Sequence, residues 1–127
     1  MDYTGVIIEE SLKDASILKK VKVLDTRIEP VTEADKTPWL KIWTLHTVEI
    51  PEDQAESYAE EVRQALKIDH TAWYADFKND TTHYIIFPQK IFKIDRTRAE
   101  EYQEASDYGI SLGIPYYQVD FSQSIIK

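Results

Sequence analysis

Cysteine is absent from this sequence of 127 residues, and the only methionine is the first residue. Without thiols the chain can form no disulfide, use no thiolate nucleophile and bind no metal through sulfur. Glycine is scarce, with three residues, so the chain has no glycine-rich loop of the kind that cradles phosphate groups. These absences exclude cysteine-dependent enzymes, metal sites with sulfur ligands and phosphate-binding glycine loops.

Long apolar runs are missing as well. No stretch approaches the roughly 20 apolar residues that a membrane span requires. The first residues, 1–5, contain neither a basic region nor an apolar segment of signal-peptide length. We therefore expect a cytoplasmic protein without a membrane partner.

Positive charge is in short supply. Acidic residues outnumber Lys and Arg by 23 to 15, which gives a net charge of -8, and the sequence pI is about 4.8. Proteins that bind nucleic acid use Lys and Arg to displace counterions from the phosphates. This balance predicts that nucleic acid is not a partner.

The composition that remains is that of a globular protein. Hydrophobic residues make up 43% of the chain and aromatic residues 12%, and this length suits one hydrophobic core. The order of strand and helix patterns predicts a single α+β domain over residues 1–121, followed by a frayed tail at 122–127. We expect a mainly antiparallel sheet of five or six strands, with two main helices packed on one face.

The clearest pattern is an aromatic and β-branched meander of three strands at residues 73–95. Its first turn falls near Asn79. A two-residue loop there would place Asp76 opposite His83, whereas a three-residue loop would place Phe77 opposite His83. The aliphatic pattern favours the second register.

Three further strands are expected before the meander. Residues 3–9 suit a first strand, and residues 21–31 alternate as an antiparallel strand with one solvated face. Residues 39–50 form the longest candidate and carry apolar groups on both faces. That pattern is typical of a strand inside a sheet, covered by helices on one side and by a loop or a second subunit on the other.

Two helices are expected. Residues 51–66 begin with Pro and acidic residues and continue with an apolar stripe at helical spacing. Residues 95–109 form the second helix, in which Thr97 and Glu100 make a capping box and Gly109 is the left-handed terminator.

Three phrases of the sequence stand out. They are Pro38-Trp39 with Trp43-Thr-Leu-His-Thr-Val-Glu-Ile-Pro51, Trp73-Tyr-Ala-Asp-Phe-Lys-Asn-Asp80 with His83-Tyr-Ile-Ile-Phe87, and Tyr108-Gly-Ile-Ser-Leu-Gly-Ile-Pro115. Together they resemble a widely distributed family of small prokaryotic proteins of unknown function. The resemblance covers nearly the whole chain, and the three phrases together are specific. It implies no activity, catalytic residue, ligand or partner.

Four aromatic residues are candidates for a binding surface on the sheet. Such a surface would take a small planar or apolar ligand, or a second copy of the chain. The alternative is an ordinary core, covered by the aromatic residues near the C-terminus. The four candidates are Trp39, Trp43, Tyr74 and Tyr84.

Histidines and aspartates supply the other candidates. His46, His83, Asp76 and Asp80 could gather on adjacent strands, but no His-x-His or His-x-x-x-His spacing supports a metal site. We therefore expect no metal. His46 lies among apolar residues of its strand, which favours a core histidine bonded to a neighbouring hydroxyl.

A Gly-x-Ser-x-Gly pattern surrounds Ser111. In hydrolases this pattern joins a strand to a helix, and the catalytic histidine follows it. Here a helix is expected before the pattern, Pro115 follows it, and all three histidines precede it. We therefore expect no catalytic serine.

Two functions remain. The favoured one is a non-enzymatic cytoplasmic interaction module that self-associates as a dimer through the aromatic sheet face or an edge strand, without a cofactor. The alternative is a small enzyme or ligand sensor that uses Asp76, His83 and His46 in a pocket walled by Trp43 and Tyr84. A closed pocket with a histidine in hydrogen-bond reach of Asp76 would favour the alternative.

Overall fold

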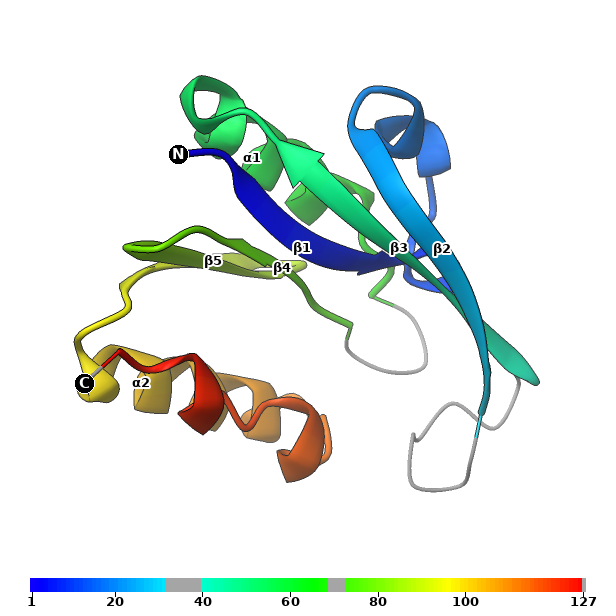
Figure 1. Cartoon of the computed structure of the whole chain (residues 1–127). Coiled ribbons are helices and arrows are strands. Elements are labelled where there is room, and N and C mark those ends of the chain that lie inside the picture. Colours follow the sequence, from blue (N-terminus) through cyan, green and yellow to red (C-terminus); the bar gives the residue numbers. More distant parts are fainter. Residues whose placement is uncertain (32–39, 69–72, 127) are drawn as a thin grey trace.

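The computed structural model describes residues 1–31, 40–68 and 73–126. In this part of the chain a six-stranded antiparallel sheet combines with two α-helices and several short 3-10 turns, the α+β class that the sequence predicts (Figure 1). The strands are β1 (Tyr3–Ile8), β2 (Lys22–Pro30), β3 (Ile42–Ile50), β4 (Ala75–Lys78), β5 (Thr82–Phe87) and β6 (Lys90–Asp95). The helices are α1 (Ala55–Ala65) and α2 (Ala99–Ser111).

The strands lie in the order β2-β3-β1-β4-β5-β6, which confirms the meander of the second half as β4, β5 and β6. The first strand, β1, joins the β2–β3 hairpin to this meander. Its backbone lies very close to β4 at Gly5, where an added Cβ would fall 1.9 Å from the Asp76 carbonyl oxygen and 2.5 Å from the Phe77 Cα. Only glycine fits there, because the neighbouring atoms belong to the backbone.

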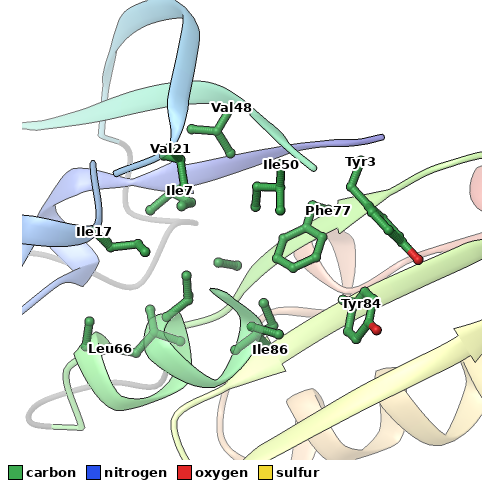
Figure 2. Packing of buried hydrophobic residues seen from close by; sticks show 14 of the residues in the cluster. Tyr3, Ile7, Ile17, Val21, Val48, Ile50, Leu66, Phe77, Tyr84 and Ile86 are labelled. Atoms are coloured by element: carbon green, nitrogen blue, oxygen red, sulfur yellow. The ribbon is translucent and has the colours of Figure 1, made fainter. Parts of the chain in front are cut away.

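Helix α1 packs on one face of the sheet. Its buried side consists of small or branched residues, so the helix can lie close to the strands. Figure 2 shows Ile7, Val48 and Ile50 from β1 and β3 in the same cluster as Ile86 of β5 and Leu66 just after the helix. This cluster is the larger of two buried cores.

Helix α2 packs on the opposite face, against Ile85 and Phe87 of β5 (Figure 1). Neighbouring residues of a strand point to opposite faces, so Ile86 meets α1 and Ile85 meets α2. The structure therefore differs from the prediction of two helices on one face. The reason lies in β5, whose residues 83–87 are all buried. A strand with apolar groups on both faces must be covered on both faces.

The β4–β5 turn has a register that differs from both predicted ones. Lys78 pairs with His83, and the Asn79 N–H donates to the Thr82 carbonyl at 3.0 Å. The Asn79 side-chain oxygen also accepts from the N–H groups of Thr81 and Thr82. Because this side chain organises the turn, Asn79 faces Thr82 and the loop consists of Asp80 and Thr81, one residue later than a two-residue loop at Asn79 and Asp80.

The end of α2 also differs from the prediction. Gly109 lies inside the helix, and Gly113 is the residue with positive φ, at 93°. A Cβ at Gly109 would lie 2.8 Å from a methyl group of Val119 and 3.4 Å from the ring of Phe87. Gly109 therefore provides close packing, and Gly113 provides the reversal of the chain.

The predicted capping box is replaced by another pair. The Asp95 carboxylate accepts from the N–H and the hydroxyl of Thr97 at 3.0 and 2.7 Å, and Glu101 accepts from the Asp95 N–H at 3.0 Å. The two bonds from Thr97 lower the pKa of the Asp95 carboxyl below its usual range. The chain enters α2 through this turn.

The tail expected to fray is attached to the sheet and α2 as far as the structure describes it, to residue 126. Arg96 donates from Nε to the Ser124 carbonyl at 3.1 Å, and Lys78 donates to the Ser124 hydroxyl at 3.0 Å. The N–H of Ile126 donates to the Arg96 carbonyl at 2.7 Å. Two half-buried basic side chains and one backbone hydrogen bond therefore anchor the tail.

Strand β2 borders the sheet and pairs only with β3 (Figure 1). Eight of its nine residues are exposed and the ninth, Glu29, is intermediate, so both of its faces are solvated rather than one. Strand β1 pairs with β3 only along Leu45–Ile50. The first part of β3 therefore has β2 as its only strand neighbour among the described residues.

Candidate functional site

The four aromatic candidates do not form one surface. Trp39 lies outside the described residues. Tyr84 is buried in the core on the α1 side, where its ring lies 5.1 Å from that of Phe77 and 5.4 Å from that of Tyr3. Tyr74 lies in the core on the α2 side. The two tyrosines are therefore on opposite faces of the sheet.

The remaining aromatic candidate, Trp43, is half-buried and makes an edge contact with Trp73, with ring centroids 5.6 Å apart. Tyr74 packs against Phe121 of the tail at 5.8 Å, and its hydroxyl donates to the Gln118 carbonyl. Burial raises the pKa of the Tyr74 hydroxyl above its usual range, and the nearby Asp76 carboxylate adds to this effect. These contacts are those of core residues, which is the alternative that the sequence left open.

A series of hydrogen bonds joins two of the polar candidates, Asp76 and His83. His83 is only 1% exposed, and its Nε2 lies 2.7 Å from the Asp76 carboxylate. Its Nδ1 lies 2.9 Å from the Tyr102 hydroxyl of α2. An ionised carboxylate only accepts, so Nε2 donates to Asp76, and in the neutral imidazole Nδ1 accepts from Tyr102.

Whether this series of hydrogen-bonded groups can act on a substrate depends on which of the groups a substrate can reach. Burial raises the pKa of the Tyr102 hydroxyl, although Arg96 opposes the shift, so this group keeps its proton at neutral pH and can donate a hydrogen bond to His83. The Asp76 side chain is 28% exposed and is the solvent-facing end of the series. Both ring nitrogens of His83 are occupied within the protein, so the imidazole has no nitrogen left for a substrate.

His46 belongs to a separate cluster, on the β2–β3 hairpin. Its Nδ1 lies 2.9 Å from the Thr26 hydroxyl and its Nε2 lies 2.8 Å from the Glu9 carboxylate. Glu10, the next residue, accepts from the N–H and hydroxyl of Thr44 at 2.6 and 2.8 Å. The predicted hydroxyl partner exists, but it is Thr26 on the neighbouring strand, and His46 is partly accessible rather than fully buried.

Two surface hollows are lined by described residues. One measures about 620 Å³ and lies beside β6, with Asp80, Thr82 and Glu101 in its wall. The other measures about 380 Å³ and lies between Lys13 and Gln64. His83, Asp76 and His46 line neither hollow, so these hollows do not form the histidine pocket of the alternative function.

No group of three or more His, Asp or Glu side chains among the described residues is arranged to hold a metal ion. No helix in that part of the chain has the length and apolar character to cross a membrane. His70 lies outside the described residues.

The most distinctive exposed feature is the outer edge of β2. Three of its apolar side chains, Val23, Leu24 and Ile28, are exposed, with Ile28 at 62%. The other border strand, β6, has α1 on one face and α2 on the other. The exposed residues of β6 are Lys90, Lys93 and Asp95, so this strand exposes no large apolar side chain of the kind found on β2. The alternation at residues 21–31 predicted the strand, but no local signal placed it at the border.

Comparison of the chain with models of known protein families, with curated proteins and with solved structures finds no match. The resemblance to a prokaryotic family therefore stays a prediction.

Proposed function

We propose that this protein is a non-enzymatic interaction module of the cytoplasm that associates with a second copy of itself through the outer edge of β2. The observation that carries the proposal is the outer edge of this nine-residue strand, which no other described strand pairs with and along which large apolar side chains are exposed. Such an edge offers rows of N–H and C=O groups to another strand. The burial of Tyr84 and Tyr74 moves the proposed contact from the aromatic face to the edge, the second of the two surfaces that the sequence favours.

The neighbouring structure supports this choice. The first part of β3 has only β2 beside it among the described strands, and a two-stranded ribbon is marginally stable alone. Added strands would shelter Ile28 and Ile42, both exposed on this ribbon. Association would therefore stabilise β2 and the first part of β3.

The alternative, an enzyme or ligand sensor, has one supporting observation, the hydrogen bond between Asp76 and His83. Because the other His83 nitrogen is bonded to Tyr102, we interpret this series of hydrogen bonds as the attachment of α2 to the sheet. The proposal of a self-associating module accounts for the exposed edge as well, which the alternative does not.

Sedimentation equilibrium from micromolar to millimolar concentration tests the proposal. We expect a reversible monomer–dimer equilibrium, because pairing of one strand buries less than the area of a permanent interface. The variant Ile28→Arg should shift the equilibrium to monomer, whereas Ile110→Arg, at an exposed apolar position of α2, should leave it unchanged. A wild-type protein that stays monomeric over the whole range contradicts the proposal.

A further inference from the structure

The backbone geometry identifies which amides of β2 face away from β3. Pro30 has no N–H, and the next residue, Val31, donates its N–H to the Lys41 carbonyl on the β3 side at 3.0 Å. Along an antiparallel pair, residues alternate between positions bonded to the partner strand and positions facing away from it. Because Val31 is bonded to β3, Pro30 is a position that faces away from it, and so are Ile28 and Thr26, two and four residues earlier. The N–H and C=O groups of Thr26 and Ile28 therefore face outward.

A bond on the far side of β3 gives the same answer. Thr44 lies opposite Ile28, and its N–H donates to the Glu10 carboxylate at 2.6 Å. Glu10 follows β1, on the side of β3 away from β2. In a non-hydrogen-bonded antiparallel pair, the backbone N–H and C=O groups of both residues point away from the partner strand. The N–H and C=O groups of Ile28 therefore also point away from β3.

Charged side chains alternate in sign along one face of this strand. Asp25, Arg27 and Glu29 are in register with Thr47, Leu45 and Trp43 of β3. Arg27 and Glu29 form an ion pair at 2.8 Å. Asp25 has no ion pair among the described residues, although it lies on the same face two residues before Arg27.

From these features we infer that two copies of β2 pair antiparallel about Thr26, with Asp25 of each copy opposite Arg27 of the other. This inference rests on the proposed self-association and specifies its register. The two Thr26 residues exchange two N–H···O=C bonds, because their backbone groups face outward. The flanking pairs of Asp25 and Arg27 are then non-bonded positions, where opposite side chains approach most closely.

Charge and overlap favour this register over its neighbours. A register centred on Arg27 would oppose two arginines and would place Asp25 opposite Glu29, which is unfavourable at adjacent strand positions. A register centred on Ile28 would pair Arg27 with Glu29, but would leave Val23 and Leu24 without a facing strand. The register centred on Thr26 places Lys22–Pro30 of the two copies alongside each other, with regular pairing ending at the bulge between Val23 and Asp25.

The exposed apolar residues match in the same register. Leu24 lies opposite Ile28 of the second copy at both ends of the paired segment, and both side chains are exposed in the single chain. The strand has a bulge between Val23 and Asp25, and Pro30 lacks a donor. These two irregularities bound the segment in which regular pairing takes place, and so limit sliding.

A charge-reversal experiment tests the register. In Asp25→Arg, arginines oppose Arg27, and in Arg27→Asp, aspartates oppose Asp25, so each variant should have a dimer Kd at least about tenfold higher than wild type. A mixture of the two variants should form a heterodimer with a Kd close to wild type, since every facing pair is then of opposite charge. Native mass spectrometry and sedimentation velocity of the mixture measure this.

Controls separate the register from the association itself. Glu29→Gln removes the ion pair within the strand and should leave the dimer intact. If wild type dimerises, Ile28→Arg abolishes the dimer and Asp25→Arg does not weaken it, the register is wrong while the proposed function stands. If wild type shows no dimer, both are wrong. Recovery of the heterodimer supports the register.

Discussion

His83 is a polar residue enclosed in an apolar core, and its two bonds link three elements of the fold. Asp76 on β4 bonds one nitrogen, and Tyr102 on α2 bonds the other. A buried polar group that loses its partner costs free energy of unfolding, whereas a partner near solvent can turn to water. The two histidines with described side chains should therefore differ in their contribution to stability.

We expect His83→Ala to lower the free energy of unfolding by roughly 2–4 kcal/mol, because it leaves a cavity and an unpaired Tyr102 hydroxyl. His46→Ala should cost less than about 1 kcal/mol, because its partner Glu9 is 49% exposed and can bond to water when the histidine is lost. Urea denaturation of the two variants measures both values. Equal losses would contradict the different burial of the two sites.

Gly5 is required by a close approach of two backbones. We expect Gly5→Ala to cost more than about 4 kcal/mol or to prevent folding, because the Asp76 carbonyl oxygen cannot move without breaking the pairing of β1 with β4. The control is Gly113→Ala, where φ is 93° but no atom lies within 4 Å of the added methyl group. That variant should lose about 1 kcal/mol from backbone strain alone. Far-UV circular dichroism with thermal denaturation distinguishes the two; a mild effect at Gly5 would show that β1 and β4 are not paired as described.

At the scale of elements, the attachment of the C-terminal tail, residues 122–126, depends on Arg96. Its side chain bonds the carbonyls of Ser124 and Asn79, at 3.1 and 2.5 Å, and so connects the tail to the β4–β5 turn. We expect Arg96→Ala to lower the free energy of unfolding by about 1–3 kcal/mol, since charge-assisted bonds are lost at a half-buried position.

The matched change is Arg98→Ala. Arg98 lies two residues further along and contacts only carboxylates at the surface, so we expect an effect below about 1 kcal/mol. Guanidinium denaturation compares the two variants. Similar midpoints for both would indicate that residues 122–126 are frayed after all.

The element types could be predicted from the sequence because they depend on local pattern. The alternation at residues 73–95 predicted three strands, and the apolar stripe at 51–66 predicted a helix, both close to the observed elements. The face of each helix could not be predicted, since it depends on which apolar residues of β5 each helix covers. The role of Gly109 was missed because its neighbours, Val119 and Phe87, are distant in sequence.

For the candidate site, residue type indicated part of the arrangement. Asp76 and His83 were among four residues that could gather on adjacent strands, but the favoured register placed Phe77 opposite His83, and Tyr102 was not a candidate. The pairing register at Asn79 determines which side chain faces His83, and a hydrogen-bonded side chain sets it. The border position of β2 depends on the order of all six strands, which no local pattern contains.

Across the whole molecule, the two faces of the sheet are covered unequally. Helix α2 and the tail cover the β4–β6 half, and α1 covers the other face, whereas β2 at the far border is solvated on both sides (Figure 1). A second copy paired along β2 would extend the sheet from six strands to twelve. The packed halves would then lie at the two ends and the exposed strands would meet in the middle.

Amide hydrogen exchange along β2, followed by NMR as protein concentration rises, tests this arrangement most directly. The N–H groups of Asp25 and Arg27 face β3, so their exchange rates should not depend on protein concentration. Thr26 and Ile28 have outward N–H groups, and we expect their exchange to slow as the dimer forms. Exchange at Thr26 and Ile28 that stays fast at every concentration would contradict the pairing of two β2 strands.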